Sequence, residues 1–257
     1  MKKKILSICL AAVIAVMAIT GASLAYLTDT DEADNVFVVG NVDIDLLEQQ
    51  RDGKGGLKDF ENDKVLLPIV GSAQGEKDSL GLPVAENYVD KIVNVKNTGK
   101  TDAFVRVVFA FPANMDDAKS AAEMMLHWNY DGSEKAGNWT REDNGAKVTI
   151  ENVEYNLYTY TYNPILATGE TTDSPAITGV YIDSRVDAAA DKDGNITYFM
   201  KNSRGEEVSA TFAKDAGPQI YVVAQAVQAK GFATVGAKAA LNEAFGEITA
   251  INNPWAE

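Results

Sequence analysis

The stretch from Asn87 to Pro112, NYVDKIVNVKNTGKTDAFVRVVFAFP, constrains the fold of this chain more than any other part of the sequence. Apolar side chains and one lysine recur there at every second position: Val89, Lys91, Val93 and Val95, then Ala103, Val105, Val107, Phe109 and Phe111. A period of two indicates a β-strand, because successive side chains point to opposite faces of a sheet. Asn97-Thr98-Gly99 is turn chemistry, so the stretch predicts two strands joined as a hairpin or as a sandwich corner.

The same strand signal returns along the rest of the chain. Asn41–Leu46 alternates polar and apolar residues without a break, and further strands are predicted within 147–164, 176–186, 187–208 and 219–229. Residues 49–64 are rich in charge and glycine and are predicted to form a loop. Burial of Val42, Ile44 and Leu46 is expected to supply part of the core, as are the strands at 88–96 and 103–111.

Two segments have helical spacing instead. In 114–129 the small or apolar residues Ala118, Ala121, Ala122 and Met125 fall on one stripe, and in 235–246 Ala237, Ala240, Leu241 and Ala244 do the same. Many short strands and two isolated helices predict a mainly β fold, an antiparallel jelly-roll-like β-sandwich with two or so short helices. No Pro- or Ser-rich linker divides residues 41–257, so they are predicted to form a single domain.

The first 25 residues have the pattern of a secretory signal peptide. Lys2, Lys3 and Lys4 precede an apolar segment, no further charge follows until Asp29, and small residues lead up to Ala25. This pattern predicts cleavage between Ala25 and Tyr26 and a secreted protein. The alternative is an uncleaved anchor, because the uncharged run 5–28 is long enough to cross a bilayer.

Cleavage would leave an acidic chain without cysteine. Cys9, the one cysteine, would leave with the signal peptide, so neither a disulfide nor a thiol nucleophile is expected in the mature protein. Loss of the three lysines takes the net charge from −14 to −17. Such a charge argues against nucleic acid as a partner, and against anionic membrane after cleavage.

Three segments resemble the TasA and camelysin family of secreted Gram-positive proteins. They are AYLTDTDEADNVFVVGNVDIDLLE, VNVKNTGKTDAFVRVVF and the terminal YVVAQAVQAKGF with ALNEAFG. The resemblance implies a jelly-roll protein at the cell surface, processed by a dedicated signal peptidase, whose characterised relatives build biofilm matrix fibres. It also implies that the N-terminal segment of one subunit adds a strand to the next. Such head-to-tail contacts give a homopolymer; an accessory matrix protein is a further candidate partner.

On this resemblance, residues 26–40 form a donor-type arm. Its apolar residues are Tyr26 and Leu27 at the new N-terminus and Phe37 and Val39 near the first core strand. Cleavage would gate assembly, because the arm is held at the membrane while the signal peptide is attached. Residues 28–35 are mostly polar and are expected to be disordered alone. The alternative is an acidic N-terminal tail without a role.

An enzyme is the second class of function to weigh, because camelysin-like relatives have been described as metallopeptidases. The chain has one histidine, His127, and no His-Glu-x-x-His motif. Glu123 lies four residues before His127 on the predicted helix, but a catalytic zinc would need further ligands. The other interpretation is a histidine at a helix end beside Trp128, and it is favoured. No catalytic residue, metal ligand or cofactor is therefore assigned, and the chain is predicted not to be an enzyme.

A surface adhesion or accessory module is the third class. Asp191, Asp193 and Asn195 have the spacing that opens a calcium loop, but Asn202 stands where an EF-hand has glutamate, which favours a β-turn. Asp29 and Asp31 are weaker cation candidates. The row of Tyr158, Tyr160 and Tyr162 is either an exposed binding strip or, as aromatic residues on strands more often do, packs across strands. The preferred prediction remains a secreted structural subunit of an extracellular matrix fibre.

Overall fold

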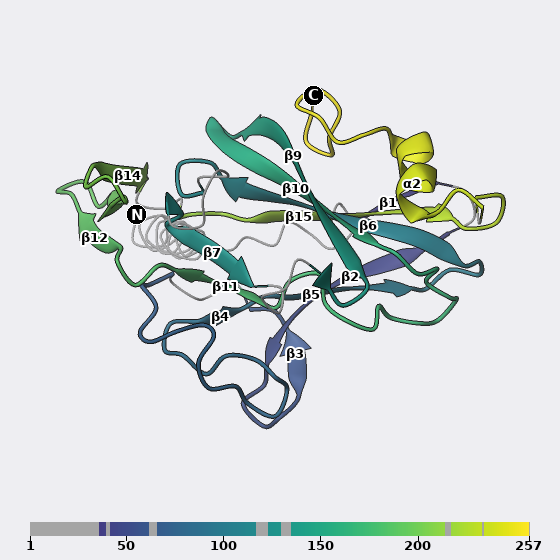
Figure 1. Cartoon of the computed structure of the whole chain (residues 1–257), viewed down its shortest axis with the longest axis horizontal. Helices are drawn as coiled ribbons and strands as arrows, with labels where there is room; N and C mark the ends of the chain where they lie inside the picture. The colour runs from purple at the N-terminus through teal and green to yellow at the C-terminus, as the bar shows by residue number, and fades with distance from the viewer. Residues whose placement is uncertain are drawn as a thin grey trace, which may run out of the picture.

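The computed structural model describes residues 36–39, 42–61, 66–116, 123–129, 135–213, 217–232 and 234–256, and these form fifteen strands and one helix. The largest sheet has six strands in the order β1-β15-β6-β10-β9-β8. Their bounds are β1 (Val36–Val39), β15 (Tyr221–Gln228), β6 (Ala103–Pro112), β10 (Val153–Tyr162), β9 (Trp139–Ile150) and β8 (Lys135–Ala136). Figure 1 shows this sheet running across the molecule.

Three smaller sheets have three strands each. Their orders are β3-β2-β5, β4-β11-β7 and β12-β13-β14. The bounds are β2 (Ile44–Arg51), β3 (Leu57–Asp59), β4 (Val89–Asp90), β5 (Ile92–Asn97), β7 (Leu126–Asn129), β11 (Gly179–Ile182), β12 (Asp187–Ala190), β13 (Ile196–Lys201) and β14 (Glu207–Phe212). One apolar core joins side chains of all four sheets, so the fold is a mainly β sandwich.

The centre of the six-stranded sheet is β6, and each of its ten residues is buried. It pairs antiparallel with β10 on one side and with β15 on the other. Val105, Val107 and Phe109 face the sandwich core, while Phe104 and Val108 belong to apolar clusters on the outer face. A strand covered on both faces needs a nearly continuous apolar sequence, and AFVRVVFAF provides it.

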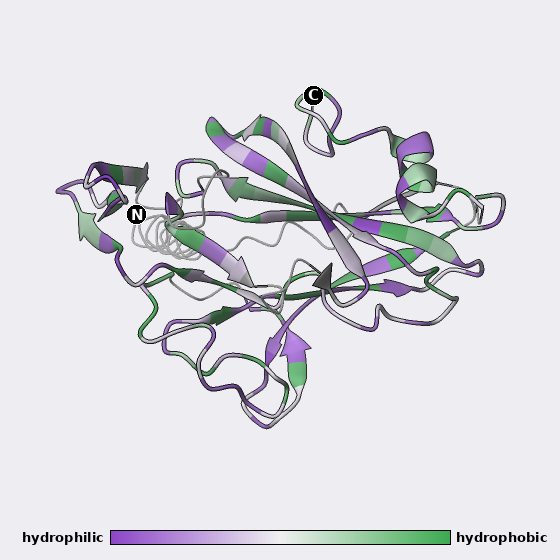
Figure 2. Cartoon of the chain, in the orientation of Figure 1, coloured by the Kyte–Doolittle hydropathy of each residue, from purple (hydrophilic) through white to green (hydrophobic). Residues whose placement is uncertain are grey.

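Helix α2 (Ala237–Phe245) and the residues after it cover the outer face of the six-stranded sheet. Ala237, Ala240 and Leu241 are buried against β6 and β15, as their helical spacing predicts. Figure 2 shows hydrophilic and hydrophobic residues alternating along this helix. Further along, Ile248 and Trp255 pack on the outer faces of β9, β10 and β15. The helix therefore completes the second side of the β6 core.

Arg106 ties α2 to the sheet from the middle of β6. Its guanidinium donates to Gln225 Oε1 at 2.6 Å, to Asn242 Oδ1 at 2.8 Å and to the Gly246 carbonyl at 3.0 Å. Burial lowers the pKa of Arg106 to about 10, with the charge of Glu142 acting in the opposite direction. A charge in the sheet interior is tolerated here because its N–H groups satisfy three acceptors.

The turn at Asn97-Thr98-Gly99 is a sandwich corner. Strand β5 before it pairs with β2, whereas β6 after it belongs to the six-stranded sheet, so the hairpin alternative is wrong. The backbone N–H groups of Thr98 and Gly99 both donate to the Asp43 carbonyl, at 3.0 and 2.9 Å. A Cβ on Gly99 would lie 2.6 Å from the Asp43 nitrogen, so this close approach requires glycine.

The predicted helix over 114–129 is wrong in its second half. Leu126–Asn129 form strand β7 and pair with β11, while Ala118, Ala121 and Ala122 lie outside the described residues. Pairing with a distant strand overrides local helical spacing here, because it buries Leu126 and stacks Trp128 on Phe111 with ring centroids 4.1 Å apart. Among the described residues α2 is the one α-helix.

The predicted loop at 49–64 also needs correction. Strand β2 continues through Gln50 to Arg51, and Leu57–Asp59 form β3 beside it. The charge and glycine content of Asp52–Gly56 marks only the short connection between these two strands. The core prediction is confirmed, since Val42 and Ile44 are buried and Leu46 packs half-buried against the core.

Candidate functional site

The described end of the predicted donor arm is strand β1, at one edge of the six-stranded sheet. It pairs parallel with β15, with Phe37 opposite Gln225 and Val39 opposite Val227. Every other pair of strands among the described residues is antiparallel. Ala25, Tyr26 and Leu27, and with them the predicted cleavage site and the start of the arm, lie outside the described residues, as do Asp29 and Asp31.

Strand β1 is a short edge strand, unlike the long strands in the interior of the same sheet. It has four residues and pairs on one side only in the described part of the chain, so its backbone is bound to β15 alone. Backbone pairing of this kind depends little on side-chain identity, and an edge is where one chain can exchange a strand with another. The arrangement can therefore support strand exchange between copies.

His127 lies on β7 rather than on a helix. Its ring stacks on Tyr181 of β11 with centroids 5.0 Å apart, and Nε2 lies 3.1 Å from Asp183 Oδ2. Burial lowers the pKa of His127, although Asp183 acts in the opposite direction. Burial would raise the pKa of Asp183, but Arg185, whose side chain donates to the carboxylate at 2.8 and 2.9 Å, and His127 together lower it to about 2.

Glu123 does not share a helix face with His127, because the chain is extended from Leu126 onward. Its carboxylate instead accepts a hydrogen bond from the Ser203 hydroxyl. No group of three or more His, Cys, Asp or Glu side chains in the described part of the chain is arranged to hold a metal ion. His127 is thus engaged with Asp183, a partner that the sequence spacing did not indicate.

The segment DKDGN is a turn, as the preferred prediction states. It connects the antiparallel strands β12 and β13, and the Asp191 Oδ1 atom accepts from the backbone N–H groups of Asp193 and Asn195 at 2.8 and 3.0 Å. Asn202 caps a second turn, because its Oδ1 accepts from the N–H groups of Arg204 and Glu206. The oxygens of Asp191 and Asn202 therefore close two turns, and the Asp193 carboxylate accepts from the Lys192 amine instead.

The tyrosine row packs across strands. Tyr158, Tyr160 and Tyr162 of β10 are all buried, so the interpretation as an exposed strip is wrong. Tyr160 packs edge-on against Phe109 at 5.1 Å and accepts a hydrogen bond from the Trp128 indole at 2.7 Å. The Tyr158 hydroxyl donates to Asp116 at 2.6 Å. These rings belong to the core.

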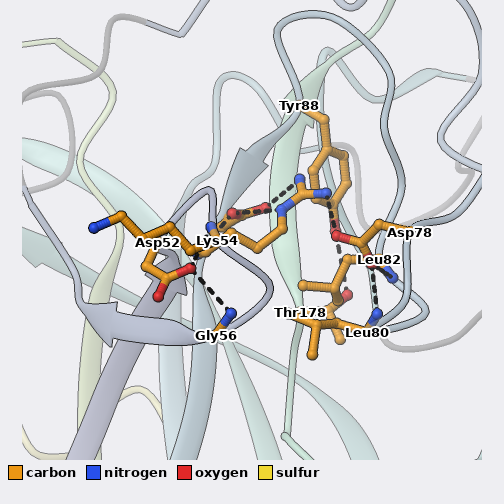
Figure 3. A network of polar contacts seen from close by, with 10 residues as sticks. Asp52, Lys54, Gly56, Asp78, Leu80, Leu82, Tyr88 and Thr178 are labelled. Carbon is orange, nitrogen blue, oxygen red and sulfur yellow. Dashed lines mark hydrogen bonds and ion pairs between the residues drawn. The ribbon is translucent and has the colours of Figure 1, made fainter.

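A polar network that the sequence did not reveal surrounds Arg51 at the end of β2. Its guanidinium donates to Asp90 at 2.8 and 2.6 Å and to Asp78 at 3.1 Å. Asp78 also accepts from the backbone N–H groups of Leu80 and Leu82, and Asp52 accepts from those of Lys54 and Gly56 in the same manner, as Figure 3 shows. Arg51 thus links β4, through Asp90, to the loop that contains Asp78, and Asp52 orders the turn that follows β2. The carboxylates of this network all accept hydrogen bonds from N–H donors.

Comparison with protein-family models finds no match to the chain, and neither does comparison with curated proteins. A search of the described residues for a helix both long and apolar enough to span a membrane finds none. Function is therefore inferred from the sequence motifs and from the geometry described above.

Proposed function

We propose that this chain is a secreted structural subunit of an extracellular matrix fibre, assembled head to tail by donation of its N-terminal strand. The observation that carries the proposal is the placement of β1: this strand, the described part of the predicted arm, lies parallel on β15 at a sheet edge. The resemblance of the N-terminal motif to the TasA and camelysin family supports the same role. Neither support depends on a ligand or a catalytic group.

In this proposal, residues 36–39 of one copy take the place of β1 on the β15 edge of the next. The exchanged strand makes the same backbone hydrogen bonds in either chain, so the exchange costs little in pairing energy. The contact is heterologous, because the donor and acceptor surfaces differ, and a heterologous contact that does not close on itself grows a filament. The connection from the exchanged strand to β2 then spans the junction between subunits.

Removal of the signal peptide would control when this exchange begins. While Ala25 and Tyr26 remain joined, the arm is tethered to the membrane by the apolar segment before it. Cleavage by the signal peptidase frees the end that must enter a neighbour. The proposed mature form is therefore both secreted and competent to assemble.

Electron microscopy of the purified chain starting at Tyr26 tests the proposal. We expect filaments from this form and monomers from a form that lacks residues 26–39. A matched control replaces residues 28–35 with alternating Ser and Gly, which keeps the length of the arm and leaves β1 in place, and it should still assemble. Equal filaments from the form without residues 26–39 would refute strand donation.

We also propose that the chain is not a peptidase. The support is the engagement of His127, whose Nε2 faces Asp183 and whose ring is stacked on Tyr181. Casein digestion by the purified chain, with and without a chelator, tests this directly. Chelator-sensitive digestion that disappears in His127→Ala would overturn it and would favour the metallopeptidase alternative. A chain that neither digests casein nor forms filaments would instead fit the adhesion or accessory module.

A further inference from the structure

A second unusual group of side chains lies where β2 meets β5, and it is independent of the β1 edge. Lys91 is almost completely buried, with 1% of its surface exposed, and Gln50 is 2% exposed. The Lys91 Nζ atom contacts the Glu48 carboxylate and lies 4.9 Å from the centroid of the Phe60 ring. The amine and the carboxylate are thus paired and shielded from water, and a buried amide lies two residues from Glu48 on the same strand.

The antiparallel register brings these three side chains to one face. Glu48 pairs with Val93 and Gln49 with Ile92, so continuing the register by one residue sets Gln50 opposite Lys91. The next pair of residues, Arg51 and Asp90, agrees with this register, because the Arg51 N–H donates to the Asp90 side chain at 3.0 Å. Residues two apart on a strand share a face, so Glu48 and Gln50 flank Lys91 from the same side of β2.

The Gln50 amide has an unused acceptor. Its Nε2 donates to Glu61 Oε2 at 3.2 Å, which fixes the orientation of the amide, and its buried Oε1 has no hydrogen-bond donor. A buried carbonyl without a donor is costly, so native structures rarely keep one without a reason. A protonated Glu48 beside it would supply the missing donor and would make the Gln50 carbonyl carbon more electrophilic.

We propose that Lys91 and Gln50 are joined after folding by an isopeptide bond, with Glu48 as the proton-transfer group. A proton moves from Nζ to Glu48, and the neutral amine attacks Cδ of Gln50. The Nζ–Cδ bond forms and the Cδ–Nε2 bond breaks, while Glu48 passes protons from Nζ to the departing nitrogen. Ammonia leaves with the remaining proton as ammonium, Glu48 returns to its carboxylate form, and no oxidant or reductant is needed.

The fold supplies what this slow reaction requires. Opposed positions on adjacent strands hold the nucleophile and the electrophile at close range, which replaces a bimolecular encounter with an intramolecular one. Burial beside Phe60 removes the water that solvates an ammonium group, and desolvated lysines serve as nucleophiles for this reason. The product is a covalent cross-link between Gln50 of β2 and Lys91, which lies between β4 and β5.

Mass spectrometry of the intact, denatured chain tests the proposal. We expect a mass lower than that of the sequence by one ammonia molecule, and a branched tryptic peptide that joins Gln50 to Lys91 and lacks cleavage after Lys91. A chain with the full sequence mass would overturn the proposal. So would an ammonia loss that maps to an asparagine succinimide, or a water loss that links Glu48 to Lys91.

Two substitutions on neighbouring residues of β2 distinguish loss of the proposed reaction from a general disturbance of the strand. Gln50→Met keeps a side chain of similar length but removes the carbonyl, and its mass should show no ammonia loss. Gln49→Met lies on the opposite face of β2 and should retain the full loss. Circular dichroism establishes that both variants fold, and retention of the branched peptide in Gln50→Met would refute the assignment of the electrophile.

Discussion

Strands β6 and β1 belong to the same sheet but are held in opposite ways. The ten residues of β6 are all buried and paired on both sides, whereas the four residues of β1 pair with β15 alone in the described part of the chain. The centre of the sheet is therefore fixed by packing on two faces, and its edge by backbone pairing on one side. Loss of the β1 pairing would therefore leave the packed centre of the sheet in place.

The largest expected effect is a substitution at the centre of β6. Phe109→Ala removes a completely buried ring that packs against Tyr160 and Phe111, and we expect it to cost about 3–5 kcal/mol of unfolding free energy. Urea denaturation followed by tryptophan fluorescence measures this. Phe37→Ala in β1 is the matched variant, and it should change filament formation more than stability. A larger loss of stability in Phe37→Ala would break the distinction between centre and edge.

A smaller loss is expected where β6 meets α2. Arg106→Leu leaves Gln225 Oε1, Asn242 Oδ1 and the Gly246 carbonyl without their donor, and we expect a loss of about 1–3 kcal/mol. Hydrogen exchange should show faster opening of α2, while exchange in β10 changes little. Uniformly faster exchange throughout the sheet would mean that Arg106 supports the whole fold rather than the attachment of the helix.

A pH titration should show a still smaller effect at His127. Its pKa is lowered in the folded chain from an ordinary value of 6.5, so the unfolded chain binds the proton more tightly. Stability should therefore fall as the pH drops below about 6.5, with a slope of at most about 1.4 kcal/mol per pH unit from this one group. His127→Gln should remove that part of the slope. An unchanged slope would show that other groups cause the acid sensitivity.

The smallest effect is expected in the exposed turn between β12 and β13. Asp191→Ala removes the acceptor of the Asp193 and Asn195 N–H groups, so the melting temperature should fall slightly. Added calcium should not change the melting temperature of either form, because the Asp191 oxygens close the turn. Stabilisation of the parent chain by calcium, absent in Asp191→Ala, would instead favour a cation site and the adhesion alternative.

The sequence predicted correctly those elements whose spacing of apolar residues matches the face that is buried in the structure. The strand within 219–229 is β15, and the helix within 235–246 is α2, each within two residues at both ends. Strand β7 was missed because its extended form depends on pairing with β11, some fifty residues further along the chain. The parallel pairing of β1 with β15 is still less local, and no spacing within either segment indicates it.

The candidate sites show the same limit of sequence reasoning. Phe37 and Val39 were assigned to an arm on the family resemblance alone, whereas the partner Asp183 of His127 comes from a distant segment, directly after β11. Lys91 and Arg106 interrupt apolar runs, which marks them as unusual, but only the fold supplies Glu48, Gln50 and Asn242 around them. A charged residue inside an apolar strand pattern can therefore be recognised from the sequence as a candidate for a buried polar site, although its partners cannot.

The most direct measurement of strand donation is a cross-link between β1 and β15. Val38 lies opposite Ala226, and neighbouring strands are close enough for a disulfide, so Val38→Cys with Ala226→Cys places one pair across this edge in a chain otherwise free of cysteine after Ala25. The variant is assembled, oxidised and separated on a denaturing gel without reductant. Strand donation predicts a ladder of covalent multimers that collapses to monomer on reduction. Filaments that yield only internally cross-linked monomers would contradict it.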